Sequence, residues 1–218
     1  MSSDKKLDEG EAALSLMGRL GLDGELAHLD EALTHPSRAN EQVGEVIDNQ
    51  RLEFLGDAVL GVCVSELLME AFREVTEGDL TLMRASLVNT GALAAGAREL
   101  GVTEVLRLGR GADASGERFR NNVLADAIEA LVGAVYLDRG LSAAREVCRR
   151  VVAPRLESLV AQGGIERDAK SRLQELLQAR GLDTPEYVVT ESKGPPHART
   201  FTVEVRMPFD QPIQASEL

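Results

Sequence analysis

Apolar side chains recur at helical spacing through most of the chain, and this pattern predicts helices as far as residue 160. The expected helical segments are residues 8–34, as two short helices broken at Gly-Leu-Asp-Gly, and residues 48–72, 82–100, 123–140 and 141–160. Asp79 is the expected capping residue ahead of the third segment. The pattern therefore predicts an all-α domain over residues 8–160.

The pattern changes after residue 160. Paired glycines and a run of charges occupy residues 161–167, which we interpret as an interdomain linker. Within residues 168–218 a helical segment is followed by two extended runs, and in the second run Phe201, Val203 and Val205 alternate with polar residues. A period of two is expected of a half-buried strand. The C-terminal part is therefore predicted to be a small, separate α+β domain.

The chain is strongly acidic, with a formal net charge of −12. This charge opposes a general electrostatic attraction to nucleic acid, although a local basic strip is compatible with an acidic metal site elsewhere. Arg107, Arg110, Arg118 and Arg120 fall in one Gly-rich segment that is a candidate for such a strip. The same segment is equally typical of a charged loop in solvent.

Cys63 and Cys148 lie in apolar helical patterns, without the spacing of a metal site or a disulfide framework. Such cysteines are typical of small buried side chains in a reducing compartment. The sequence contains no apolar stretch long enough for a signal peptide or a membrane span. We therefore predict a cytoplasmic protein without a membrane partner.

Two pairs of carboxylates interrupt the apolar runs. Glu53 and Asp57 are four residues apart within NQRLEFLGDAVLG, and Asp126 and Glu129 are three apart within LADAIEALVGAVYL. Because both segments are apolar nearly all round, we interpret them as buried helices. A buried carboxylate is costly unless a cation, a metal ion or a proton compensates it.

These four acids are hard oxygen ligands, the type that suits Mg²⁺ or Mn²⁺ and disfavours Zn²⁺. The chain has only three histidines, which opposes a histidine-based metallohydrolase. A carboxylate-held Mg²⁺ supports hydrolytic phosphoryl transfer. Ion pairs between the acids and arginines such as Arg51 or Arg84 are the alternative that the sequence leaves open.

The stretch NQRLEFLGDAVLG resembles the signature of bacterial ribonuclease III, and the similarity continues through LTHPSRANE, EGDLTLMRASLVN, LRLG and LADAIEALVGAVYLD. The tail resembles a double-stranded-RNA-binding domain through KSRLQELLQARG, PEYVV and GPPHARTFTVEV. The resemblance implies an all-α endonuclease domain followed by a small α+β domain of the α-β-β-β-α type. The sequence ends before the third strand, the Lys-rich segment and the final helix of such a domain, so we expect an incomplete, weakly binding domain.

The resemblance also implies roles for individual residues. Metal binding is implied for Glu53, Asp57, Asp126 and Glu129, the active site for Asp57 and Glu129 in particular, an auxiliary acid for Glu77 and a dimer contact for Phe54. RNA contacts are implied for Ser171, Gln174, Glu175, Gln178 and His197. Gln50 stands where many family members have Glu, so we expect an altered Mg²⁺ affinity but not inactivity.

The implied activity is Mg²⁺-dependent hydrolysis of double-stranded RNA by a homodimer, with Mn²⁺ as a substitute. The products would carry 5′-phosphate and 3′-hydroxyl ends and short 3′ overhangs, and the implied targets are ribosomal RNA precursors and some messenger RNAs. Two alternatives stay open at this point. One is a non-catalytic duplex-RNA-binding dimer, and the other is a nucleotide phosphohydrolase with the same carboxylate site.

Overall fold

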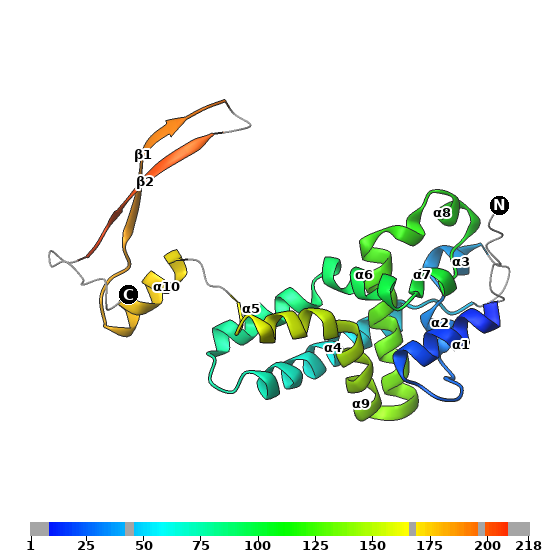
Figure 1. Cartoon of the computed structure of the whole chain (residues 1–218). Helices are drawn as coiled ribbons and strands as arrows, with labels where there is room; N and C mark the ends of the chain where they lie inside the picture. The colour runs from blue at the N-terminus through cyan, green and yellow to red at the C-terminus, as the bar shows by residue number, and fades with distance from the viewer. Residues whose placement is uncertain (1–8, 42–45, 166–168, 196–198, 209–218) are drawn as a thin grey trace, which may run out of the picture. The chain divides into compact units, whose positions relative to one another are not determined.

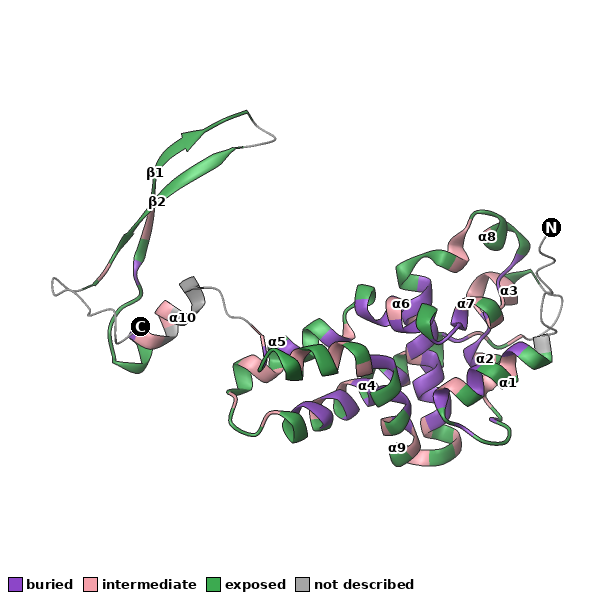
Figure 2. Ribbon diagram, viewed as in Figure 1, coloured by how far each residue is buried: buried purple, intermediate pink, exposed green. Residues whose placement is uncertain are grey.

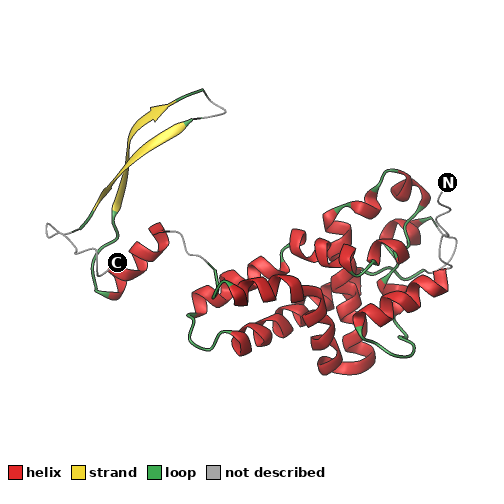
Figure 3. Cartoon of the chain, in the orientation of Figure 1, coloured by secondary structure: helices red, strands yellow, loops and turns green. Residues whose placement is uncertain are grey.

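The computed structural model describes residues 9–41, 46–165, 169–195 and 199–208, and the chain divides into two compact units (Figure 1). The first unit ends at Ile165 and is helical; the described part of the second contains one helix and two strands (Figure 3). The predicted fold class, an all-α domain followed by a small α+β domain, is confirmed. Among the described helices, none combines the length and the apolar character that crossing a membrane requires.

Two long helices form the centre of the first unit: α4, Gln50–Ala71, and α9, Asn121–Ala161. Buried residues concentrate where these helices face each other, and most of them are Leu, Val and Ala (Figure 2). The other described helices of this unit are α1 Glu9–Leu20, α2 Leu29–Ala32, α3 Pro36–Asn40, α5 Glu77–Val88, α6 Thr90–Glu99, α7 Val102–Val105, α8 Arg110–Ala114 and the 3₁₀-helix η1 Glu117–Phe119. The core therefore depends on aliphatic packing around one central helix pair.

The backbones of α4 and α9 approach very closely at two glycines. A Cβ atom added to Gly56 would lie 1.7 Å from the carbonyl oxygen of Glu129, and one added to Gly133 would lie 2.3 Å from the carbonyl oxygen of Leu52. No real Cβ tolerates such distances, and neither backbone carbonyl is free to swing aside. The two glycines therefore fix how near the helices come, and with it the position of Glu129.

Helix α9 consists of two helical segments that meet at Gly140. This residue has φ 80° and ψ −179°, a conformation that side-chain-bearing residues rarely adopt. The end of one helix at Gly140 and the start of another after it were predicted from the sequence, and both are confirmed.

The predicted continuous helix over residues 82–100 is wrong, because the chain breaks at Asn89. This residue is extended, with φ −67° and ψ 158°, and its Oδ1 accepts a hydrogen bond of 2.9 Å from the backbone N–H of Ala92, so that it caps α6. Asn competes well for such cap positions and poorly for helix interiors. The predicted cap at Asp79 is also wrong: Thr76 is the N-cap of α5, and its Oγ1 accepts from the Asp79 N–H at 3.3 Å.

Cys63 on α4 and Cys148 on α9 are both fully buried, as predicted. Their thiols also lie close enough to share a hydrogen bond, which raises the pKa of Cys148 and lowers that of Cys63. The sequence did not predict this pairing, because nothing in the spacing of two distant cysteines reports that their helices cross.

The second unit contains α10, Ala169–Ala179, and an antiparallel pair of strands, β1 Glu186–Lys193 and β2 Thr200–Arg206. The register pairs Tyr187 with Val205 and Val189 with Val203, and it shifts between Val189 and Glu191. The predicted half-buried strand is instead exposed along its whole length, with Phe201 at 55% exposure. Val189, Phe201, Val203 and Val205 are exposed, whereas Tyr187 and Val188 at the start of β1 are partly buried.

Replacing Gly56 with alanine is expected to lower the free energy of unfolding by about 3 kcal/mol, the upper range for overpacked sites, because the added methyl group meets only backbone atoms. Gly18→Ala in α1 is the matched control, since a methyl group there has nothing within 4 Å and alanine favours a helix by up to about 1 kcal/mol. Urea unfolding measures both variants. A Gly56→Ala protein as stable as the parent would show that α4 and α9 can move apart to make room for the added methyl group.

Candidate metal centre

Three carboxylates meet where α4 crosses α9. Glu53 comes from the first turns of α4, and Asp126 and Glu129 come from adjacent turns of α9. One carboxylate oxygen from each residue lies within 4.8 Å of the others, and all three side chains are half-buried. The close helix crossing at Gly56 therefore gathers three oxygen ligands in one place.

The start of α4 is held in position by the segment that precedes α3. The N–H of Asn49, a buried residue at the helix N-cap, donates to the carbonyl of Thr34 at 2.9 Å. The N–H of Glu53 donates in turn to the carbonyl of Asn49 at 2.8 Å. Thr34 forms an isolated bridge with Arg107. Glu53 therefore lies one turn into a helix whose N-cap residue, Asn49, is hydrogen-bonded both to Thr34 and to Glu53.

Burial raises the pKa of all three carboxylic acids, and repulsion by neighbouring carboxylates raises that of Glu53 and Glu129 further. Desolvation is the largest cause for Glu129, followed by the charges of Asp57, Asp126 and Glu53, and together they raise its pKa to about 7. Desolvation and then Asp126, Asp48 and Asp57 raise the pKa of Glu53. Desolvation also raises the pKa of Asp126, opposed by the positive charge of His35. The group therefore holds more negative charge than its surroundings compensate.

Arginine pairing, the alternative left open by the sequence, does not occur among the described residues. The guanidinium of Arg84 donates to Ser65 Oγ at 3.1 Å, and Arg51 is exposed without a salt bridge to any of the acids. Two compensations remain: a proton, which the raised pKa of Glu129 favours, and a divalent cation, which suits three clustered carboxylate oxygens. The donor set fits Mg²⁺ or Mn²⁺.

Asp57 lies beside this group and is exposed, which corrects the interpretation of α4 as buried all round. Its charge raises the pKa of Glu53 and Glu129, so it lies within electrostatic reach, but it is not among the three residues within 4.8 Å. The helical angle places Asp57 near Val64 and Leu68, which are buried. Asp57 differs in exposure from these two residues because it lies nearer the start of the helix. α5 packs beside the later half of α4, where Arg84 contacts Ser65.

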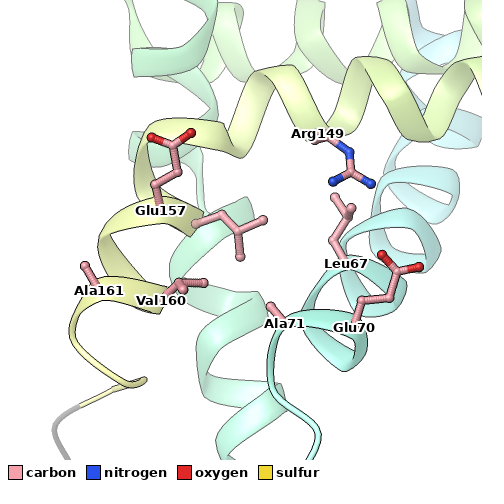
Figure 4. A pocket seen from close by; sticks show the side chains of 8 residues that line it. Leu67, Glu70, Ala71, Arg149, Glu157, Val160 and Ala161 are labelled. Carbon is pink, nitrogen blue, oxygen red and sulfur yellow. The ribbon is translucent and has the colours of Figure 1, made fainter.

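A mostly apolar hollow of about 470 Å³ lies between α4 and the last turns of α9 (Figure 4). Leu67, Ala71 and Val160 point toward it, and charged side chains such as Glu70 and Arg149 stand at its edge. Leu67 is roughly 20 Å along the helix from Glu53 at 1.5 Å per residue. The hollow is therefore separate from the metal centre.

Residues 25–156 match a family described as ribonuclease-III-like, and residues 169–215 match the double-stranded RNA binding motif. The chain belongs to the ribonuclease III family. The resemblance stated from the sequence is thereby confirmed over both parts of the chain.

Curated relatives support the ribonuclease III assignment over nearly the whole length. Ribonuclease 3 of Streptomyces coelicolor is 45% identical over 204 residues, which cover 93% of this chain and 73% of that protein. Ribonuclease 3 of Thermobifida fusca is 49% identical over 182 residues, covering 82% and 73% respectively.

A solved nuclease domain of ribonuclease III from Campylobacter jejuni has a similar fold. It matches with a TM-score of 0.58 and 33% identity, over 64% of this chain and 95% of that domain. The description of that structure concerns flexibility in a region involved in dimer formation. The helical architecture built around α4 and α9 is therefore the ribonuclease III nuclease fold.

Besides Asp57, two further residues of the first unit with roles implied by the ribonuclease III resemblance lie outside the three-carboxylate group. Glu77 is exposed at the start of α5, where its carboxylate accepts a hydrogen bond of 3.0 Å from Thr81 Oγ1. Phe54 is 84% exposed on α4. Their roles stay predictions.

The predicted RNA-contacting residues of the second unit are only partly described. Ser171, Gln174, Glu175 and Gln178 all lie on α10; the side chain of Gln174 is half-buried and that of Gln178 is exposed. His197 lies outside the described residues. Their contacts with RNA also stay predictions.

The Arg-rich segment is largely engaged within the protein. Arg107 pairs with Asp30 at 3.0 Å, Arg120 with Glu117 at 3.5 Å, and Arg118 with Asp113 at 2.8 Å. Arg118 also donates to two backbone carbonyls, those of Thr103 and Leu106. These contacts favour the interpretation of the segment as a structured surface loop.

Replacing Glu129 with glutamine is expected to stabilise the metal-free protein at high pH. Because the folded-state pKa of about 7 exceeds the ordinary value of 4.5, the stability from the protonated acid is complete below about pH 4.5 and is lost as pH rises through 7. At pH 8 the variant should exceed the parent by about 1 to 2 kcal/mol, a value reduced for partial exposure. At pH 4.5 the two should be equally stable.

Thermal and urea unfolding in chelator, from pH 4.5 to pH 8, measure this difference. Glu77→Gln is the matched control, because Glu77 is exposed and lies outside the group. A Glu129→Gln protein whose stability follows the parent at every pH would refute the buried, repelled state of Glu129.

Proposed function

We propose that the chain hydrolyses double-stranded RNA with a Mg²⁺ ion held by Glu53, Asp126 and Glu129, with Asp57 beside them. The observation that carries this proposal is the group of three half-buried carboxylates whose charge no described basic side chain neutralises by an ion pair. Mn²⁺, which accepts the same oxygen ligands, is the expected substitute.

Membership of the ribonuclease III family makes the chain an endoribonuclease, and the motif over residues 169–215 supports duplex RNA as its ligand. A non-catalytic RNA-binding dimer is the weaker alternative. Such a scaffold gains nothing from three repelling carboxylates at its helix crossing, which only reduce its stability.

The bound cation would polarise the scissile phosphate, activate water and stabilise the departing oxygen. Glu53, Asp126 and Glu129 would each present one carboxylate oxygen to it. Asp57, which is exposed beside the group, would accept a hydrogen bond from the attacking water and so orient it. The oxygen of water would form a bond to phosphorus while the bond from phosphorus to the 3′ oxygen breaks. One proton of the water would pass to the departing 3′ oxygen and the other to the phosphate or to solvent, which gives a 5′-phosphate and a 3′-hydroxyl.

An exposed apolar stripe on α4 supports a homodimer. Phe54, Val62 and Met69 are 84%, 51% and 63% exposed and recur on the helix side away from α9. Exposed apolar stripes of this kind mark protein interfaces. Two protomers would supply two metal centres, one for each RNA strand, and cuts offset across the strands would leave short 3′ overhangs.

The wider biological assignments rest on the family alone. We propose that the substrates include ribosomal RNA precursors and structured messenger RNAs, and that Gln178 and its neighbours on α10 contact the duplex. The domain limits 8–160 and 168–218, the linker 161–167 and the cytoplasmic location also stay predictions.

Asp57→Asn and Glu129→Gln are each expected to reduce the rate of cleavage of a long RNA duplex in Mg²⁺ by about 10³-fold, since each removes a charge that the metal chemistry requires. Gel assays measure cleavage, and a filter assay in Ca²⁺ measures RNA binding, which should be retained. Glu74→Gln, an exposed glutamate after α4, is the control.

Cleavage that survives both substitutions would overturn the assignment of these acids. Binding of duplex RNA by the parent protein without any cleavage would favour the non-catalytic dimer. Hydrolysis of free nucleotides with no action on duplex RNA would favour a nucleotide phosphohydrolase.

Phe54→Ala is expected to raise the dissociation constant of the dimer about 30-fold, because an aromatic anchor at the centre of an interface typically contributes about 2 kcal/mol. Leu14→Ala on α1 is the matched control, since Leu14 is also strongly exposed, at 72%. Sedimentation equilibrium measures both variants. Equal dissociation constants for Phe54→Ala and the parent protein would place the interface elsewhere.

A further inference from the structure

His35 lies in the stretch LTHPSRANE, to which the proposed function assigns no role. It is the N-cap of the short helix α3, and its ring nitrogen Nδ1 accepts a hydrogen bond of 3.2 Å from the backbone N–H of Ser37. Ser37 Oγ lies 2.8 Å from the same nitrogen and accepts in turn from the N–H of Gly109 at 3.0 Å. The imidazole is therefore held on its Nδ1 side by groups that are themselves anchored.

These contacts decide which ring nitrogen of His35 carries the proton of the neutral imidazole. A backbone N–H can only donate, so Nδ1 must accept and the proton lies on Nε2. The side chain is half-buried, and within the described parts of the chain Nε2 has no hydrogen-bond partner. His35 thus presents an N–H donor that no described protein group uses. A protonated Nε2 has no free lone pair, so it cannot ligate a cation.

Backbone hydrogen bonds place His35 beside the start of α4. The carbonyl of Thr34 accepts from the N–H of Asn49 at 2.9 Å, and the carbonyl of Asn49 accepts from the N–H of Glu53 at 2.8 Å. The N–H of His35 itself donates to the carbonyl of Arg107 at 3.0 Å, which fixes its backbone from the other side. Two hydrogen bonds therefore join the residue next to His35 to the residue that carries one of the three clustered carboxylates.

An anionic oxygen is the acceptor that suits the free donor of His35. Hydrolysis at the metal centre requires the phosphates of an RNA strand to approach the start of α4. Hydrogen bonds to charged oxygens are stronger than those between neutral groups, and contacts to phosphates fix the position of a nucleic-acid strand. An N–H donor held next to the centre therefore has a use when RNA is bound.

We propose that His35 is a substrate-binding residue of the endonuclease, whose Nε2–H donates a hydrogen bond to a phosphate of the RNA strand at the metal centre. The cation occupies the oxygens of the scissile phosphate, so the contact falls on a neighbouring phosphate of the same strand. The inference rests on the proposed function, because it requires the strand to lie across Glu53, Asp126 and Glu129.

Two substitutions separate this role from helix capping. His35→Asn keeps an oxygen in place of Nδ1, at a cap position where Asn is preferred, and removes the outward N–H. His35→Gln keeps an amide N–H that reaches about as far as Nε2 and removes the cap. We expect His35→Asn to lower kcat/KM for a long RNA duplex in Mg²⁺ about tenfold, the lower range for a hydrogen bond to a charged group, at an unchanged unfolding temperature.

His35→Gln should retain most of the cleavage activity and unfold at a lower temperature, because it loses the cap. Asn89→Ser is the control, since it exchanges the N-cap residue of α6 for another preferred one and should change neither quantity.

A modified RNA locates the contact. Methylphosphonates placed singly at the phosphates on either side of the scissile bond each remove one anionic oxygen. At the contacted phosphate this change should slow cleavage by the parent protein about tenfold but slow His35→Asn no further, because that variant already lacks the interaction.

The outcomes separate the two proposals. Activity equal to the parent in His35→Asn, or effects of His35→Asn and the methylphosphonate that multiply at every position, would overturn the contact and leave His35 as a helix cap only. Calorimetric titration with MgCl₂ without RNA should give equal affinities for the parent and His35→Asn, and a weaker affinity in the variant would also overturn the contact. A parent protein that binds no divalent cation would overturn the metal centre itself.

Discussion

The close crossing of α4 and α9 is the constraint on which the rest of the molecule depends. Gly56 lies against the carbonyl of Glu129, and Gly133 against the carbonyl of Leu52. The two glycines that allow the backbones of α4 and α9 to approach thus lie in the same turns that carry the carboxylates. Because the glycines and the acids share these turns, the depth of the packing and the spacing of the carboxylates cannot vary independently. The helix pair is at once the core and the frame of the centre.

This arrangement costs stability at the point where the chemistry is expected. Three carboxylates in a partly dry crossing repel each other, as the raised pKa of Glu129, to about 7, indicates. The aliphatic core around them, which includes Leu52, Leu60 and Ile128, offsets that cost. A helix pair that kept the three carboxylates farther apart would be more stable without metal, but it would bind a cation less well. Local destabilisation of this kind is expected at functional sites.

Sequence reasoning recovered what is local and missed what depends on contacts between distant segments. The acids, the break at Gly140 and the change of pattern after residue 160 were predicted because periodicity and glycine act within a few residues. The break at Asn89 was missed because an apolar run hides a capping residue. The exposure of Asp57 was missed because periodicity describes positions around a helix, whereas the cover from α5 varies along it. The pairing of Cys63 and Cys148 needs the helix crossing to be known first.

Helix α4 looks apolar nearly all round because both its packed side and its outer side carry apolar residues. One side, with Leu52, Gly56 and Leu60, packs inside the unit, and the opposite side exposes Phe54 and Val62. Glu53 is half-buried, and Asp57, next to it around the helix, is exposed. An α4 helix that packs within one protomer alone is expected to have a polar outer side, so the exposed apolar side supports the proposed second copy. In the proposed dimer the carboxylates would occupy an edge of the helix that neither interface needs, which would leave that edge accessible to a cation and to a duplex.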